Sequence, residues 1–166
     1  MYTTIEQFAA DWTNETMATQ RAMDLLTDAS LAQEIAPGHR VLGQLAWHLV
    51  TTVHEMLTRT GLEFASPAED ERAPQSARQI AQSYRIVSAA MLDAVRSQWT
   101  DQDLQRATNM YGEEWKNGLT LHIFISHEIH HRGQMTVLMR QAGLRVPDIY
   151  GPTREDWLAR GMVPLL

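Results

Sequence analysis

Cysteine is absent from this chain of 166 residues, and basic residues are fewer than acidic ones. Without cysteine the chain forms no disulfide, has no thiolate nucleophile and cannot bind zinc through sulfur, which fits a reducing compartment. The 14 Lys and Arg against 20 Asp and Glu give a formal charge of −6. Because phosphate binding normally needs a basic surface, this charge argues against a nucleic-acid partner.

Long apolar runs are also missing. No run approaches the roughly 20 residues needed to cross a bilayer, and the first residues have neither the basic start nor the apolar core of a signal peptide. Hydrophobic residues make up 44% and charged residues 20%, the balance of a folded globular protein. The length is that of one ordinary domain. We therefore expect a single soluble, cytoplasmic domain over residues 1–166, with no membrane partner.

What the chain does contain is helical periodicity. Apolar residues recur at steps of three and four in four long segments, the spacing of a buried helical face. Predicted caps and stops bound these segments: Thr4 and Ser76 as N-caps, Gly61 and Gly143 as stops. The first predicted helix begins at about residue 5 and loses its periodicity between residues 28 and 34. The other three span about 39–60, 77–98 and 119–141.

A short helix is expected at the C-terminus, where Thr153 and Asp156 occupy capping positions before Trp157. We find no convincing alternating pattern of a strand. The economical architecture is all-α, a four-helix bundle with a short C-terminal helix.

Two connections are long. Residues 61–75 hold an acidic cluster (Glu69, Asp70, Glu71) and suggest a solvated loop. Residues 99–118 are polar, with turn signals at residues 111–112 and 117–118, and long loops of this kind often border a functional site. Three aromatic residues of the loops are candidates to line such a site: Tyr111, Trp115 and Tyr150.

Histidines interrupt two of the predicted buried faces. In the second helix, His48 stands where a leucine is expected, in the stripe Val41, Leu45, His48, Thr52 and Met56. In the fourth helix, a helical wheel places His127 and His131 in the middle of one mostly apolar face. The members of that face are Thr120, Ile123, Phe124, His127, His131, Gln134, Met135 and Leu138.

The other histidines fall elsewhere on these wheels. His122 lies on the far side of the fourth helix, His130 flanks the His127/His131 pair, and His54 and His39 are predicted to lie at the surface. A second apolar patch on the fourth helix indicates a helix that is either central or part of a dimer interface. Its members are Ile125, Ile129 and Val137.

If the second and fourth helices are neighbours, His48, His127 and His131 converge. Three histidines with an open position form a metal site suited to catalysis, since water or substrate can enter the coordination shell. Gln134 and Thr52 could then orient water or substrate, and Glu55 could serve an outer shell. The simpler alternative is that a lone His48 is a hydrogen-bonded core histidine.

The segment 127–131 also matches H-E-x-x-H, the zinc metalloprotease motif, in which Glu128 would be the general base. The motif is short enough to arise by chance in a histidine-rich helix. A protease of that class also needs a strand to align a peptide and a third ligand downstream, for which Glu155 is the one well-placed carboxylate. The protease is therefore the weaker hypothesis.

Several segments together resemble the DinB/YfiT-like metalloenzymes, and the likeness covers nearly the whole chain. Its most specific part is the string H-x-x-H-H-R-G-Q. The segments are residues 45–49, 127–134, 140–143 and 146–152. The resemblance implies a four-helix bundle that binds one divalent metal ion through His48, His127 and His131. It also implies a homodimer, as is common in the family.

The function expected from this resemblance is that of a metal-dependent enzyme acting on a small-molecule substrate. Some relatives are thiol-dependent transferases or isomerases, in which the metal activates a low-molecular-weight thiol. The metal would be Zn, Ni or Fe. The family name records induction by DNA damage, a stress response, and not DNA binding. The alternative is a non-catalytic dimer that is stabilised by metal or senses it.

Overall fold

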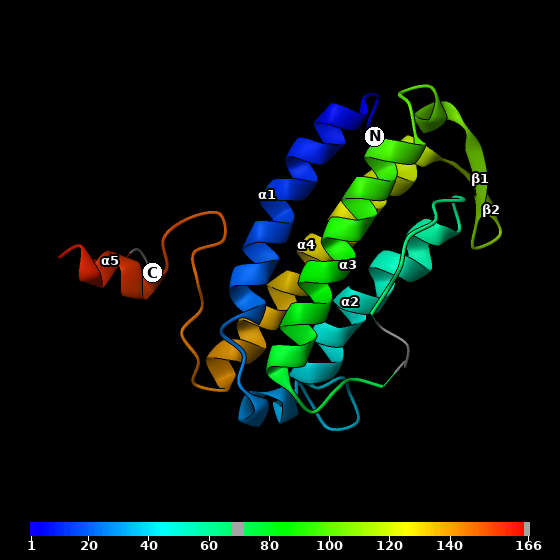
Figure 1. Cartoon of the computed structure of the whole chain (residues 1–166). Coiled ribbons are helices and arrows are strands. Elements are labelled where there is room, and N and C mark those ends of the chain that lie inside the picture. The colour runs from blue at the N-terminus through cyan, green and yellow to red at the C-terminus, as the bar shows by residue number, and fades with distance from the viewer. Residues whose placement is uncertain (68–71, 165–166) are drawn as a thin grey trace.

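The computed structural model describes residues 1–67 and 72–164 (Figure 1). Its body is built of four long helices, which confirms the predicted bundle, and the short helix α5 confirms the predicted C-terminal helix. The acidic cluster predicted in the 61–75 loop falls on residues 69–71, outside the described residues. The helices are α1 (Ile5–Met23), α2 (Leu42–Thr58), α3 (Ala77–Gln98), α4 (Asn117–Gln141) and α5 (Arg154–Ala159).

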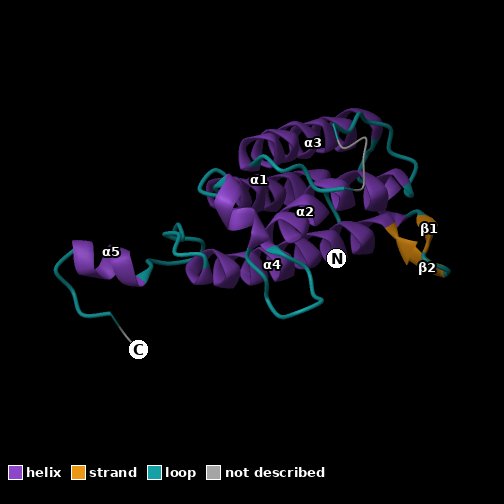
Figure 2. Ribbon diagram, turned by 90° about the horizontal axis from the view of Figure 1, so that it is seen from below, coloured by secondary structure: helices purple, strands orange, loops and turns teal. Residues whose placement is uncertain are grey.

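The long helices pack as a ring of neighbours, although not in chain order. α1 packs mainly against α3 and α4, and α2 packs against the same two helices. α1 and α2 therefore occupy opposite corners of the bundle, joined by a crossing that contains the 3-10 helix η1 (Asp28–Ala32). The contact between α2 and α4 brings the two histidine-bearing helices together, as the metal hypothesis required (Figure 2).

The helix starts follow the predicted caps. The Thr4 hydroxyl accepts a hydrogen bond from the Gln7 amide at 3.3 Å, and Ser76 accepts one from the Gln79 amide at the same distance. Thr153 and Asp156 form a reciprocal capping box at the start of α5. Each cap satisfies an amide that the helix itself leaves unpaired, and such caps typically contribute about 1 kcal/mol. Local sequence therefore fixes where these helices begin.

The core fills the centre of the bundle with the apolar stripes of the helices. Trp12 is buried, and its Nε1 donates to the carbonyl of Ser88, so α1 is joined to α3 through the core. Burial of each large apolar side chain contributes roughly 1.5–3 kcal/mol. In α3 the apolar residues at helical spacing are buried throughout: Ile80, Tyr84, Val87, Met91 and Val95.

A small hairpin corrects the expectation that the chain has no strand. β1 (Ala107–Met110) pairs antiparallel with β2 (Glu113–Lys116) after the 3-10 helix η2 (Asp103–Gln105). The predicted turn at Tyr111-Gly112 is confirmed: their φ angles of 56° and 92° fit a two-residue hairpin loop. The strands have four residues each and no alternating burial, so their sequence carries no strand signal.

The expected turn at residues 117–118 is wrong, because these residues open α4. Both are buried, and the Asn117 side chain donates to the Asp103 carbonyl and accepts from Thr108. A Cβ atom at Gly118 would collide with the backbone carbonyl of Tyr2, whose amide donates to the Gly118 carbonyl at 3.0 Å. Gly118 therefore allows the N-terminal residues to lie against the start of α4.

The C-terminal segment leaves the bundle after Gly143, where the predicted helix stop is confirmed by a positive φ of 76°. α5 stands apart from the four long helices (Figures 1 and 2) and has no buried residue. No helix of the described ranges 1–67 and 72–164 is long and apolar enough to cross a membrane.

Candidate metal centre

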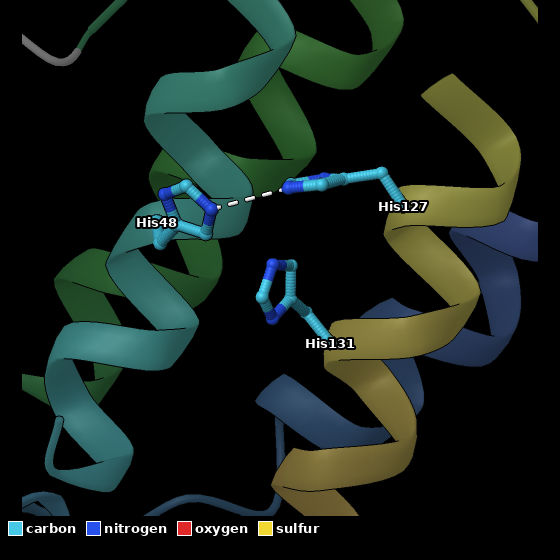
Figure 3. Close-up of side chains that lie close together, drawn as sticks. All are labelled: His48, His127 and His131. Atoms are coloured by element: carbon cyan, nitrogen blue, oxygen red, sulfur yellow. Dashed lines mark hydrogen bonds between the residues drawn. The ribbon is translucent and has the colours of Figure 1, made fainter. Parts of the chain in front are cut away.

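Three histidine side chains meet between α2 and α4 (Figure 3). His48 comes from α2, and His127 and His131 come from successive turns of α4. One ring nitrogen from each lies within 4.8 Å of the others, and His48 Nε2 is 3.2 Å from His127 Nε2. The structure thus brings together the three residues that the sequence singled out.

Two of these rings are hydrogen-bonded to neighbouring side chains through Nδ1. His131 Nδ1 lies 2.7 Å from Gln134 Oε1, and His48 Nδ1 lies 3.3 Å from the Thr52 hydroxyl. Because an amide oxygen can only accept, Nδ1 of His131 carries the proton and its Nε2 keeps a free lone pair. Gln134 and Thr52 thus contact the rings themselves, and not water or substrate as we predicted from the sequence.

The spacing of the nitrogens fits a shared ion. Two imidazole nitrogens, each 2.0–2.1 Å from one tetrahedral zinc ion, lie roughly 3.3 Å apart, close to the 3.2 Å between His48 and His127. All three side chains are partly exposed, which leaves room for a further ligand. A group of three neutral imidazoles is a donor set that can hold a divalent metal.

The surroundings keep the imidazoles neutral. Burial, and after it the positive charge of Arg40, lowers the pKa of His48 to about 4. Burial, and after it the neighbouring His131 and His130, lowers the pKa of His127 to about 4. Burial also lowers the pKa of His131, partly offset by its hydrogen bond to Gln134. A metal ion binds unprotonated imidazole, so near neutral pH it would displace no proton from these rings.

The buried face of α4 differs from the predicted one. The wheel placed His127 and His131 at the centre of the buried face, but they lie at its edge, while Glu128 and Arg132 are each only 1% exposed. Thr120, Phe124, Met135 and Leu138 are buried as predicted. α4 is apolar on several sides, so its sequence did not define one stripe.

Glu128 and Arg132 enter a polar network on the α1 and α3 side of α4. Glu128 accepts hydrogen bonds from the Tyr84 and Thr19 hydroxyls. Arg132 forms an ion pair with Glu15 and donates to the Thr19 hydroxyl. No buried side-chain nitrogen or oxygen atom within the described residues lacks a hydrogen-bond partner, so the network is satisfied.

The same network reaches the C-terminal segment. The Tyr150 hydroxyl contacts both Arg132 and Glu15. Tyr150 therefore fixes the segment after α4 to the bundle and does not line the histidine cluster.

The position of Glu128 argues against the protease hypothesis. Its carboxylate points into the core toward Tyr84, on another side of α4 from the three histidines. A general base must reach the water at the metal. Glu155, the expected downstream ligand, lies on α5 and is not part of the histidine group.

Glu55 faces the hairpin instead of the His48 ring. Its carboxylate accepts from Arg59 at 2.7 Å and from the Tyr111 hydroxyl at 2.8 Å. The hairpin turn is thereby joined to α2, and Trp115 contacts the Tyr111 ring. The long connection therefore contacts α2 at Glu55, and that it borders the site stays a prediction.

The remaining histidines lie outside the group. His122, His130 and His39 are exposed, and the His54 ring packs against Phe64. His130 has its ring centroid 4.9 Å from that of His131 and borders the group.

The expected second apolar patch of α4 is largely covered. Ile125 is buried and Ile129 packs against the core, which leaves Val137 as its one exposed member.

Comparison with known proteins places this fold and site in a family. The model of the DinB family matches residues 1–162. The chain belongs to the DinB family. It is 47% identical to YrdA of Bacillus subtilis (strain 168), described as an uncharacterized protein, over 162 residues, 98% of this chain and 97% of that protein.

Two solved DinB-like structures share the fold. One, from Bacillus cereus ATCC 10987, has a TM-score of 0.87 and 51% identity, covering 90% of this chain and all of that one. The other, YjoA of Bacillus subtilis, has a TM-score of 0.69 and 20% identity, covering 86% of this chain and 97% of that one. The resemblance seen in the sequence is thus confirmed, and so is the mostly helical DinB-like fold.

Proposed function

We propose that this DinB-family protein binds one divalent metal ion through His48, His127 and His131 and acts as a metal-dependent enzyme on a small molecule. One observation carries the proposal. Three imidazoles from two helices meet with their nitrogens within 4.8 Å, and two of the rings are fixed through the nitrogen that faces away from the group. Histidines that bind a metal typically have their other ring nitrogen hydrogen-bonded in this way, so the arrangement supports a common ligand.

The donor set limits the metal and its use. Imidazole nitrogen suits Zn, Ni and Fe, whereas Mg and Ca prefer oxygen ligands. When bound by three protein ligands, such an ion acts as a Lewis acid on water, on an oxygen atom or on a thiolate in its open position. The protein's own part is to hold three neutral rings on the α2 and α4 scaffold.

A low-molecular-weight thiol is the co-substrate that we propose. Two features support it: the resemblance to a family in which some relatives are thiol-dependent transferases or isomerases, and the absence of a cysteine that would compete for the metal. A thiolate that enters an open position would become the nucleophile, and its proton would leave to solvent.

A non-catalytic role is the second candidate, and it has its own observation. Neither Glu55 nor Glu128 is free to act as a base, because Glu55 is hydrogen-bonded to Arg59 and Tyr111, and Glu128 is turned into the core. In this role the bound metal would stabilise the bundle or report metal availability.

Metal analysis followed by an activity screen separates these candidates. Elemental analysis of the purified protein should find about one metal ion per chain. A protein that is metal-free, folded after chelation and unable to rebind metal would refute the site. A screen of thiols with electrophiles should then show turnover by the wild type and none by folded His48→Ala. If no substrate turns over while His131→Ala lowers the melting temperature of the metal-loaded protein, the non-catalytic role is favoured.

We also propose that the protein is a homodimer. Support comes from the family resemblance and from apolar side chains exposed on and after α5, where Leu158 and Met162 are each 49% exposed and Val163 is 88% exposed. Light scattering should give twice the chain mass, and truncation after Tyr150 should reduce it to one chain. A wild-type mass of one chain would refute the dimer.

A further inference from the structure

A cavity of about 750 Å³ lies next to the histidine group, between η1, the start of α2 and residues 72–75. His48 forms part of its wall and is also a member of the histidine group. Small-molecule sites typically occupy 300–1,000 Å³. A molecule in this cavity would therefore lie beside His48, one of the three histidines of the proposed metal site.

The charged residues of the cavity differ in how they are engaged. Asp28 accepts a hydrogen bond from the Ala77 amide at 2.7 Å, which holds its carboxylate at the start of α3. Arg40 is exposed, and within the described part of the chain it has no hydrogen bond or ion pair. Among the described residues, no carboxylate therefore neutralises the charge of Arg40.

Arg40 also acts on the histidine group. Its positive charge is a secondary cause, after burial, of the lowered pKa of His48, His127 and His131. Glu55 opposes this effect at His48 and His127, but its carboxylate already accepts from Arg59 and Tyr111. The cavity lining also holds Glu34 and Arg72, and among its four charged side chains Arg40 is the one that acts on the histidine group.

The walls away from Arg40 are partly apolar. Trp47 and Leu31 are buried residues of the cavity wall, and Ala73 and Pro74 face them from the segment before α3. Gly43 permits this arrangement, since a Cβ atom there would lie 3.0 Å from Leu31 Cβ. Within the described residues, the cavity offers an apolar surface and, in Arg40, a cation without an ion-pair partner near the proposed metal.

We propose that this cavity binds a small anion, with its carboxylate or phosphate group between Arg40 and the metal centre and its apolar part against Trp47. The inference rests on the proposed metal site and names the class of substrate for it. A guanidinium and a divalent ion both favour oxyanions, and an arginine can bind them with two parallel hydrogen bonds. A neutral molecule of the same shape would lose both attractions.

The test uses metal-loaded full-length protein and three probes: benzoate, inorganic phosphate and neutral benzamide. Calorimetry should show benzoate or phosphate binding more tightly than benzamide, and the two anions show which oxyanion the cavity prefers. Arg40→Gln should weaken anion binding about tenfold, the effect of losing a charged hydrogen bond. Arg96→Gln, which removes an exposed arginine of α3 and changes the net charge equally, should leave it unchanged.

Metal content is measured first on each sample, because it shows whether the metal site or the anion site alone is refuted. If wild-type protein holds no metal, the proposed function fails and the anion site fails with it. If metal is bound but benzamide binds as well as both anions, or if Arg40→Gln binds anions as wild type does, the anion site alone is refuted. Far-ultraviolet circular dichroism confirms that both variants are folded.

Discussion

Two sides of α4 carry polar groups that are held in opposite ways. His127 and His131 face α2, are partly exposed, and have ring nitrogens directed at one another. Glu128 and Arg132, each one position further along, face α1 and α3 and are almost completely buried. On the first side, bonding capacity is left for a ligand. On the second, each charge already has its partners within the protein.

The contrast follows from the cost of burying charge. An unpaired buried ion is strongly destabilising, so a buried Arg and Glu must be fully hydrogen-bonded. A neutral imidazole costs less to leave partly unpaired, in particular at the edge of the core. One helix can therefore present a site on one side and be fixed in place on the other. Changes on the two sides should have separable effects.

The largest effects are expected from Arg132→Met, which changes the buried side of α4, and from His127→Ala, which changes the histidine side. Arg132→Met should destabilise the metal-free protein by about 3 kcal/mol, because Glu15 loses its ion-pair partner and Thr19 its donor. The folded variant should still bind one metal ion. His127→Ala should abolish metal binding at little cost to the metal-free protein. Urea unfolding and elemental analysis measure the two quantities.

A surface arginine provides the control for this pair. Arg85 forms an ion pair with Asp24 on the exposed side of α3, so Arg85→Met should cost less than about 1 kcal/mol. If Arg132→Met abolished metal binding in folded protein, the two sides of α4 would not be separable.

A smaller effect is expected at Gln134. Gln134→Met keeps the length of the side chain but removes the acceptor for His131 Nδ1. Loss of such a partner typically weakens metal binding about 10-fold to 100-fold, and we expect the lower end because His131 keeps its place on α4. Competition with a coloured chelator gives the Kd. Gln141→Met, at the exposed end of α4, is the matched control, and an equal effect there would remove the assigned role of Gln134.

The smallest effect is expected from pH near neutrality. The pKa values of His48 and His127 are lowered to about 4, so both rings are unprotonated from pH 8 to pH 6. The metal Kd should change little in that range and should rise as the pH falls toward 4. In the metal-free protein the free energy of unfolding also decreases as the pH falls. The unfolded rings bind protons below about pH 6.5 and the folded rings do not, so stability decreases as pH falls from 6.5 toward 4. Affinity that weakened steadily from pH 8 would contradict these values.

The sequence predicted the helices and the meeting of the three histidines better than it predicted the faces of α4. Caps at Thr4 and Ser76 are local signals, and they were found. His48, His127 and His131 were found because an imidazole inside an apolar stripe is unusual. α4 carries apolar residues on several sides, so periodicity could not distinguish the edge of its buried face from the centre.

The network of Glu128 and Arg132 could not be read from sequence spacing. Its partners Glu15, Thr19 and Tyr84 lie on other helices, and only the packing of the bundle brings them together. The one available signal was the presence of two residues of opposite charge one turn apart in the middle of a long helix. The hairpin was missed for a different reason, since its strands have four residues each and show no alternation.

The separation of the histidines along the chain has a consequence for folding. His48 and His127 are 79 positions apart, and α3 and the hairpin lie between them. Closing so long a loop has an entropic cost that only the packing of the helices can repay. The group of three nitrogens therefore exists only once α2 has docked on α4. In a refolding experiment started with metal present, full-affinity metal uptake should follow bundle assembly and mark its completion.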